Sequence, residues 1–511
     1  MRIHVLIYLV ILTLTAACST GDGGGPAGSE DVPVVGDGVA DQAAPPAGPP
    51  RLHVAGTEWV DPDGNPVFLR GVNLGAWTYH ETWISQVGYD LAGRALVMAQ
   101  EAGYGEEAAA AVVLLDQAGD ELEGQGLSWL DGFEQELAAD IGADEAAALR
   151  ASIEQYLPTV RDDSDRPLYQ LLETRFGVEA RDALIATFMD AWIQEEDIAW
   201  LAQTGFNLVR VPIGYRPLTA VSHLAPITEI LPNERTFERI ERLLDWCETY
   251  GLHAVIDIQE SPGGHNTYSG PARLYDDPAM QALTVALWEE LSRRFIDRDV
   301  VAAYSLLAEP FGAPSPEARD AMYDKLVKAI RAKGDDHVLV IHDGFLGMDT
   351  LPMPADMGWT NVVYSTHLFE FSADSLAFWE GLVDLFYPFT LEAPFETHGV
   401  PYYIGSFSAG KDEPWAYDVA EMLVDYFEAH GWSWSLWTFK RIDDPIAFTL
   451  LGETSGYGVL TGHADFDRPD VHRDDLETLM TKMTAYADYP FAPNEALVGA
   501  LLSGRVPPPR R

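Results

Sequence analysis

The chain has 511 residues, of which 47% are hydrophobic, so it can bury a large core and is not a disordered polymer. It carries 80 acidic against 32 basic residues, a formal net charge of -48, and a field of that sign repels nucleic acids and other polyanions. We therefore predict no nucleic-acid partner and favour a neutral ligand, with a solvated acidic surface as the simplest account of the charge.

The first 18 residues have the pattern of an export signal. Arg2 precedes an apolar run over 5–14, and small residues come directly before Cys18. This arrangement resembles the bacterial lipoprotein box, in which the cysteine is lipidated and becomes the new N-terminus. Thr15 departs from the aliphatic residue usual there, so export with cleavage nearby and no lipid is the alternative. The first interpretation predicts a membrane anchor on Cys18, facing the periplasm or the cell surface.

Residues 19–50 are rich in Gly, Pro, Ala and Asp, a composition typical of a flexible linker. A β-hairpin is predicted next, with strands at 52–54 and 67–70 around a turn at 61–65. We take 51–490 as one domain and 491–511 as a C-terminal tail.

Eight short apolar segments read as strands, at 70–75, 207–213, 252–258, 302–307, 337–342, 361–367, 401–407 and 432–438. Helical patterns separate them, for example at 191–204, 236–250, 279–295, 316–333 and 415–430. This alternation predicts a parallel sheet closed as a (β/α)8 barrel. A doubly wound open sheet is the alternative, although no glycine-rich phosphate loop follows the first strand.

An Ala- and Glu-rich segment at about 86–160 falls between the first strand and its regular helix, and it contains helical patterns at 106–116 and 144–156. In a barrel it would lie on the C-terminal face, where active sites are built. A lid or subsite wall and an insertion with no function are equally good interpretations.

Glu309 is the candidate for acid–base chemistry. Glycoside hydrolysis needs two carboxyl groups that flank the scissile bond, and barrels present catalytic side chains at the C-terminal ends of their strands. Glu309 follows the strand at 302–307 and precedes Pro310, which suits a general acid. A loop carboxylate without a catalytic role is the alternative.

Six segments resemble, in chain order, family five of the glycoside hydrolases (the cellulase family), and most nearly its exo-β-1,3-glucanase branch. They lie at 69–77, 81–84, 192–197, 205–215, 256–266 and 431–440. The resemblance implies a barrel that acts on or binds a carbohydrate without a cofactor. No recognisable metal-ligand spacing occurs in the sequence.

The resemblance also implies residue roles. Glu309 would be the acid/base, Arg210 would hold the charge of the nucleophile, and Trp437 would be the platform under the sugar at the cleavage point. The other predicted substrate-binding residues are Trp77, Glu81, Gln259, Asn266 and His367. Aromatic residues at strand ends or in the following loops are candidates to stack on sugar rings: Trp77, Trp83, Tyr268, Phe311, Phe407, Trp415 and Trp437.

Three positions depart from the family pattern. Ser406 stands where the family has the nucleophilic glutamate, Ala308 replaces an asparagine and Gln259 replaces a histidine. A serine hydroxyl cannot form a glycosyl intermediate unless a base activates it. Two hypotheses remain: a glycosidase acting on a neutral β-glucan or β-glycoside, and a catalytically inactive protein that binds glycan or serves as a scaffold at the cell surface. Arg210 would also lack its usual partner, which could be replaced by an anion or by another carboxylate, with candidates at Glu260, Glu370 and Glu413.

Overall fold

A computed structural model describes residues 48–87, 91–125, 129–154, 165–268, 271–370, 373, 375–409, 413–443, 458–464 and 466–505. The predicted signal segment, Cys18 and residues 19–47 of the predicted linker lie outside the described residues. Among those described, no helix combines the length and the apolar character needed to cross a bilayer.

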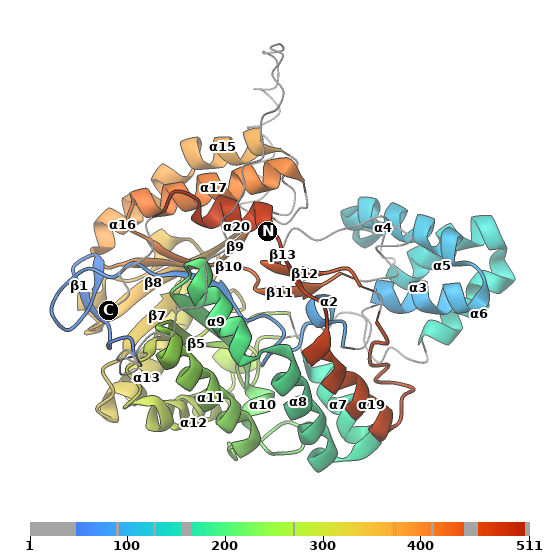
Figure 1. Cartoon of the computed structure of the whole chain (residues 1–511), viewed down its shortest axis with the longest axis horizontal. Helices are drawn as coiled ribbons and strands as arrows, with labels where there is room; N and C mark the ends of the chain where they lie inside the picture. Colours follow the sequence, from blue (N-terminus) through green and yellow to red (C-terminus); the bar gives the residue numbers. More distant parts are fainter. Residues whose placement is uncertain are drawn as a thin grey trace, which may run out of the picture. The chain divides into compact units, whose positions relative to one another are not determined.

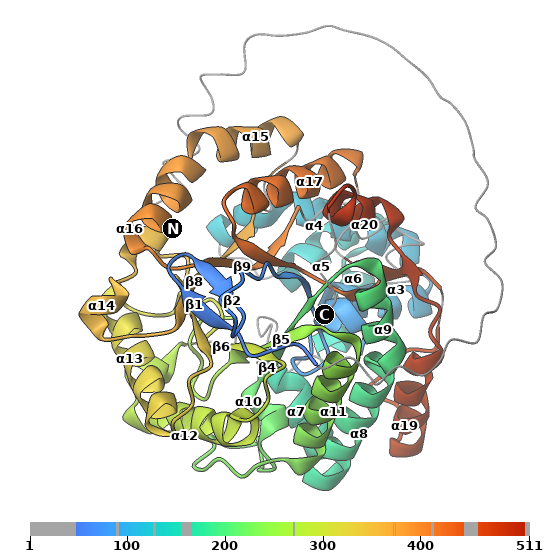
Figure 2. The ribbon, with the colours of Figure 1, turned by 60° about the vertical axis from the view of Figure 1, so that its left-hand side comes forward.

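Eight parallel strands close into a ring, in the order β10-β3-β4-β5-β6-β7-β8-β9 (Figures 1 and 2). The ring closes where β10 pairs with β3, with Trp434 beside Arg70 and Leu436 beside Val72. This confirms the (β/α)8 barrel and excludes the open sheet. All eight strands lie where the sequence predicts them: β3 (Arg70–Asn73), β4 (Leu208–Gly214), β5 (His253–Glu260), β6 (Val301–Ser305), β7 (Val338–His342), β8 (Val362–Phe369), β9 (Tyr402–Ser408) and β10 (Ser433–Leu436).

Helices surround the ring, as Figure 2 shows: α8 (Val178–Trp192), α9 (Glu195–Thr204), α11 (Glu234–Tyr250), α12 (Pro278–Phe295), α13 (Pro316–Ala332), α15 (Leu376–Leu385), α16 (Ala393–His398) and α17 (Pro414–Ala429). Their starts follow from local chemistry. Asp277 caps α12 by accepting from the Ala279 amide, and Ser315 caps α13 by accepting from the Ala318 amide. The predicted helix at 191–204 is instead the end of α8 and all of α9, because Gln194 is extended and forms a capping box with Asp197.

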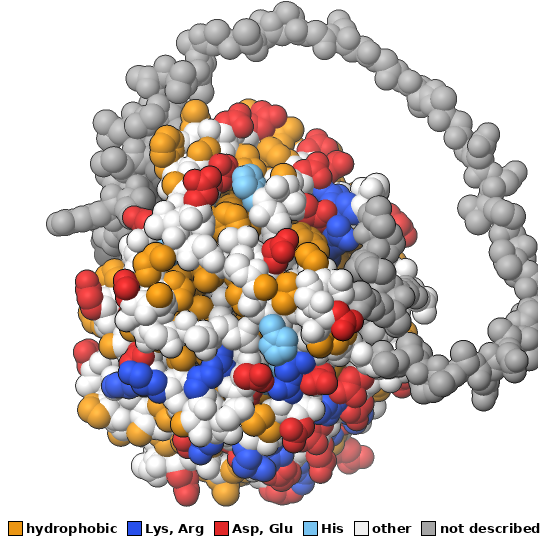
Figure 3. All heavy atoms as spheres, turned by 90° about the vertical axis from the view of Figure 1, so that its left-hand side faces the viewer, with side chains coloured by type: hydrophobic (Ala, Val, Ile, Leu, Met, Phe, Trp, Pro, Cys, Tyr) orange, Lys and Arg blue, Asp and Glu red, His pale blue; other side chains and the backbone are white. Residues whose placement is uncertain are grey.

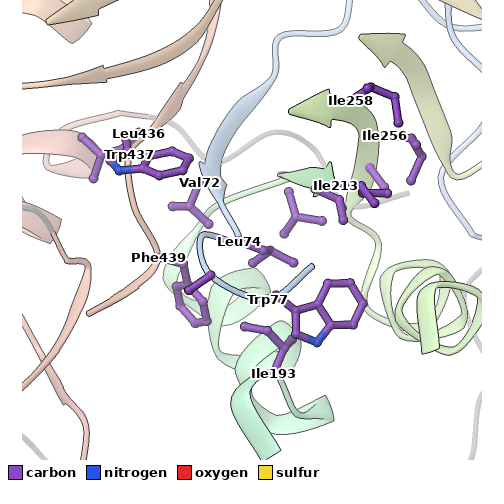
Figure 4. Close-up of a cluster of buried hydrophobic side chains, with 14 of the residues drawn as sticks. Val72, Leu74, Trp77, Ile193, Ile213, Ile256, Ile258, Leu436, Trp437 and Phe439 are labelled. Carbon is purple, nitrogen blue, oxygen red and sulfur yellow. The ribbon is translucent and has the colours of Figure 1, made fainter. Parts of the chain in front are cut away.

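The strands are apolar because the helices cover them. Figure 4 shows part of the resulting core, with side chains from β3, β4, β5, β10 and the residues that follow β3 and β10 gathered in one cluster: Val72, Leu74, Ile213, Ile256, Ile258, Leu436 and Phe439. Successive strand residues point to opposite faces, so residues that alternate with these ones face the inside of the ring. Several of the inward residues are polar, and they make up the site described below.

The N-terminal hairpin differs in its pairing from the prediction. β1 (His53–Ala55) pairs with β2 (Glu58–Val60), not with 67–70. Gly56 has a φ of 59°, which allows the tight turn between the two strands. The predicted turn at 61–65 is present as a second turn, in which the Asp61 carboxylate accepts from the backbone of Asn65. The hairpin covers the N-terminal end of the barrel, where Trp59 packs edge-on against Tyr403.

The inserted segment is helical. It comprises α3 (Leu91–Ala102), α4 (Gly105–Gln125), α5 (Trp129–Ile141) and α6 (Ala143–Glu154); α2 (Thr82–Ser85) precedes it and α7 (Arg166–Phe176) follows it. Buried residues of α3 to α6, among them Leu96, Phe133 and Ile153, form a hydrophobic cluster separate from the barrel core. This part of the chain therefore has a core of its own.

The C-terminal residues pack on the barrel. α19 (Leu476–Thr484) lies against α8, and α20 (Glu495–Leu502) lies against α17. A small sheet joins β11 (Lys440–Ile442), β12 (Leu460–Gly462) and β13 (Ala492–Pro493). The predicted tail thus contributes a strand and a helix. On the face drawn in Figure 3, acidic side chains are spread among Lys and Arg rather than gathered in one patch.

Two glycines provide a matched test of the packing. A Cβ on Gly71 would lie 2.8 Å from both the Cβ and the backbone oxygen of Leu208, so we expect Gly71→Ala to lower the free energy of unfolding by about 1–3 kcal/mol. Gly381 lies inside α15 with nothing within 4 Å of an added Cβ, so Gly381→Ala should raise it by about 0.5–1 kcal/mol. Urea unfolding of both variants measures this, and equal effects of the two changes would contradict the close packing of β3 on β4.

Candidate active site

A buried ion pair lies inside the barrel, between β4 and β5. Nη2 of Arg210 is 2.8 Å from Oδ2 of Asp257, and Nη1 donates to Oδ1 of Asn73 at 2.6 Å. Gln259 accepts a longer hydrogen bond of 3.4 Å from the same guanidinium. Burial raises the pKa of Asp257 above its usual value, and Arg210 opposes that rise. Arg210 therefore has a carboxylate partner although position 406 carries no charge.

This corrects the sequence interpretation of Arg210. The carboxylate that pairs with it is Asp257, which was not among the predicted candidates. Glu260 is held by a different arginine, because Nη1 of Arg216 donates to it at 2.5 Å and to Asp165 at 2.6 Å. A local signal for Asp257 did exist, since it is a charged residue between two isoleucines of a buried strand and alternates onto the same face as Gln259.

Glu309 follows β6 and is fixed by hydrogen bonds to both of its oxygens. Oε1 is 2.5 Å from Nδ1 of His367, and Oε2 accepts from the Tyr268 hydroxyl at 2.7 Å. The side chain is buried, with 7% of the residue exposed. Its backbone has a φ of 50°, a left-handed conformation that costs a non-glycine residue about 1 kcal/mol or more. The surrounding contacts thus hold the carboxylate in one place and one orientation.

The hydrogen bonds determine the tautomer of His367. Burial lowers the pKa of His367 well below its ordinary value, and the nearby Arg210 guanidinium lowers it further, so the ring is neutral. A carboxylate only accepts, so we assign the proton to Nδ1, which donates to Glu309. Nε2 is then an acceptor. The ring also meets the edge of His342, with ring centroids 4.3 Å apart.

A second histidine supports the backbone before Glu309. His265 lies 2.5 Å from the Ala308 carbonyl through Nε2 and 3.0 Å from the Ser261 hydroxyl through Nδ1. Burial lowers its pKa to about 4, so it is neutral at pH 7 and donates to the carbonyl. Asn266 follows it, is buried, and accepts from the Tyr268 amide at 3.3 Å. The loop after β5 is thereby tied to Ala308, the residue directly before Glu309.

Ser406 lies on β9 opposite His367 on β8, directly after a shift in the register of the two strands. Only 2% of the residue is exposed, and among the described residues its hydroxyl has no hydrogen-bond partner. Ser435, a buried serine of the neighbouring strand β10, differs in this respect. Its hydroxyl bonds the Tyr403 hydroxyl at 2.5 Å and the Gly405 carbonyl at 2.8 Å. The free hydroxyl at 406 is therefore not a general property of serines in this barrel.

The predicted sugar-binding tryptophans have different surroundings. Trp77 is only 1% exposed, and its indole nitrogen donates to the Met189 carbonyl at 2.9 Å. Figure 4 shows it beside Ile193 in the core, so the structure gives a role in binding substrate no support. Trp437 directly follows β10, and its backbone amide donates to the Phe407 carbonyl, so it lies at the C-terminal end of the ring. Glu81 precedes α2 and is partly exposed.

Aromatic side chains extend outward from Glu309. Tyr268 is 37% exposed and meets Phe311 edge-on, with ring centroids 5.0 Å apart. The ring centroid of Phe311 in turn lies 6.1 Å from that of the exposed Phe345. Sequence reasoning included the first two residues among the stacking candidates, but missed Phe345 and the hydrogen bond from Tyr268 to Glu309. The described residues contain no group of three His, Cys, Asp or Glu side chains placed to hold a metal ion.

The match to known proteins agrees with this geometry. Residues 173–442 match the model of the family described as Cellulase (glycosyl hydrolase family 5), which is more than half of the chain. The chain therefore belongs to glycosyl hydrolase family 5, as the sequence predicts.

The individual relatives share about a quarter of their aligned residues with this chain. A beta-xylosidase of Phanerodontia chrysosporium is 25% identical over 323 residues, 62% of this chain and 51% of that protein. A probable glucan 1,3-beta-glucosidase A of Emericella nidulans is 27% identical over 213 residues, 40% of this chain and 49% of that protein. The chain thus spans about half the length of the curated relatives it matches. Among solved structures, Cel5A of Thermotoga maritima in complex with cellobiose is 21% identical, with 61% of this chain and 92% of that chain covered and a TM-score of 0.44.

The two buried serines give a direct test of the site. Ser406→Ala removes a buried hydroxyl that has no hydrogen-bond partner among the described residues. We therefore expect the free energy of unfolding to stay unchanged or to rise by at most about 3 kcal/mol. Ser435→Ala removes one partner from each of two buried oxygens and should lower it by about 1–3 kcal/mol. Chemical denaturation of the two variants decides this, and a larger loss for Ser406→Ala would mean that its hydroxyl is bonded.

Proposed function

We propose that this protein binds a neutral β-glucan or β-glycoside at the C-terminal end of its barrel and does not hydrolyse it by double displacement. The observation that carries the proposal is Ser406, a neutral side chain at the nucleophile position, with the Arg210 charge already balanced by Asp257. Retaining hydrolysis needs a carboxylate on each side of the glycosidic bond. Family membership and the kept Glu309 support a carbohydrate ligand, and the net charge of -48 favours a neutral one.

Several side chains are available to such a ligand. The exposed rings of Tyr268 and Phe345 offer apolar faces of the kind on which sugar rings stack. Gln259 adds a half-buried amide near the end of β5, able to donate to and accept from sugar hydroxyls. Partly apolar sites with a few placed polar groups are typical of small-ligand binding.

Calorimetric binding tests the proposal. We expect short neutral β-1,3- or β-1,4-gluco-oligosaccharides to bind, polygalacturonate not to bind, and aryl β-glucosides to remain unhydrolysed. Tyr268→Ala removes an exposed ring and should weaken binding by about 0.5–1.5 kcal/mol, the size of an aromatic contact. Absence of binding to a broad panel of neutral glycans would contradict the proposal, and robust turnover of aryl glycosides would favour an active glycosidase instead.

Restoring the missing carboxylate extends this test. Ser406→Glu should create hydrolysis of aryl β-glucosides, and Ser406→Gln, which has the same size without the charge, should not. In the Ser406→Glu background, Glu309→Gln should lower the rate by roughly 10²–10⁴-fold, the usual contribution of a general acid. A Ser406→Glu variant that binds glycan but stays inactive would show that Ala308 and Gln259 limit the chemistry as much as Ser406 does.

We also propose that the protein is exported and anchored by a lipid on Cys18, on the basis of the sequence pattern alone. The full chain, expressed in a bacterium, should partition with the membrane fraction. Cys18→Ser should release it, because the lipid is then not attached. Recovery of the wild-type chain in the soluble exported fraction would instead support cleavage without lipidation.

A further inference from the structure

Ser406 lies across from a histidine that a carboxylate orients. His367 is paired with Ser406 across β8 and β9, and the register shifts just before this pair, so Gly405 and Ser406 of β9 both lie opposite His367 of β8. An added Cβ on Gly405, the residue before Ser406, would lie 2.8 Å from Nε2 of His367. The imidazole nitrogen that points away from Glu309 therefore lies beside the backbone that carries Ser406.

The proton positions suit proton transfer from the serine. Nδ1 of His367 donates to Glu309, which leaves the Nε2 lone pair free to accept. The Ser406 hydroxyl has no partner to give up, and rotation about its Cα–Cβ bond redirects it. A hydroxyl, a neutral imidazole and a carboxylate on the far nitrogen are the three parts that activate a serine nucleophile on unrelated folds.

We propose that Ser406, His367 and Glu309 form an acyl-transfer site that hydrolyses small carboxylic esters carried on a sugar. Ser406 is the nucleophile, His367 the general base and acid, and Glu309 the positioning residue that fixes the imidazole tautomer. The sugar part of the substrate rests on the proposed function, whereas the acyl chemistry does not.

The reaction balances with water as the only co-reactant. The Ser406 oxygen attacks the ester carbonyl while its proton passes to Nε2 of His367. The tetrahedral intermediate expels the sugar hydroxyl, which takes that proton, and an acyl-serine remains. Water then attacks the acyl-serine, His367 again accepts and returns the proton, and the carboxylic acid leaves.

Burial restricts the acyl group. Ser406 is 2% exposed and His367 is 4% exposed, so only a small acyl chain can reach the hydroxyl. An acetyl ester meets this requirement, with the larger and more polar sugar left at the mouth of the barrel near Tyr268. The expected substrate class is thus an O-acetylated neutral glycoside.

Labelling with methanesulfonyl fluoride, a small serine reagent, tests the nucleophile. The full chain should gain one methanesulfonyl group, mapped by peptide mass spectrometry to Ser406, and Ser406→Ala should gain none. Ser435→Ala is the matched control and should label like the wild type, because the hydroxyl that it removes is already hydrogen-bonded. No label, or a label at another residue, would overturn the proposal.

The roles of His367 and Glu309 are tested separately. His367→Asn should slow labelling and p-nitrophenyl acetate hydrolysis by roughly 10²–10⁴-fold, the contribution of a general base. Glu309→Gln should also slow them, because its amide can donate to Nδ1 and favour the opposite tautomer. Nitrogen-15 NMR of His367 reports that tautomer directly, which a purely structural role would not change. Unchanged rates in either variant would contradict the assigned roles.

Two substrates separate this inference from the proposed function. Acetate release from p-nitrophenyl acetate depends on the acyl site alone, whereas release from an O-acetylated methyl β-glucoside also needs the sugar to bind. Hydrolysis of p-nitrophenyl acetate but not of the acetylated glucoside would support the acyl-transfer site and contradict the proposed glycan ligand. Equal rates of ester hydrolysis by the wild type and Ser406→Ala would contradict the acyl-transfer site, whether or not the protein binds glycan.

Discussion

The side-chain amide of Asn73 ties together the four strands at which the barrel closes. Asn73 ends β3, accepts from Arg210 on β4, and donates to the carbonyls of Gly405 on β9 and Leu436 on β10. An amide both donates and accepts, so one buried group can satisfy a guanidinium and two backbone oxygens together. The amide that accepts from Arg210 is therefore held in place by strands that only the closed ring brings together.

The charge inside the barrel is balanced without position 406. Arg210 and Asp257 are both buried and 2.8 Å apart, and leaving one of them unpaired would cost about 3–5 kcal/mol. Because the pair is complete, a neutral serine at 406 creates no uncompensated charge. This explains in physical terms how the chain keeps a buried arginine with a neutral serine at position 406.

Glu309 serves both proposals through the same contacts. His367 and Tyr268 fix its two oxygens, and His265 anchors the carbonyl of the preceding residue. A carboxylate held in this way can face a glycosidic oxygen at the mouth of the barrel, and it also orients a neutral imidazole toward Ser406. In both proposals position 406 supplies a hydroxyl and no carboxylate.

The sequence by itself determined the eight strands, the helices after them, the family and the positions of Glu309, Arg210 and Ser406, because these follow from local patterns of polarity and from short motifs. It did not determine the pairing of the hairpin, the burial of Trp77, or the partners of Arg210 and Glu309. Those depend on residues far apart in the chain, such as Glu309 and His367, or Asn73 and Leu436. Only closure of the ring brings such residues within hydrogen-bond distance, since the register between neighbouring strands decides which inward side chains meet.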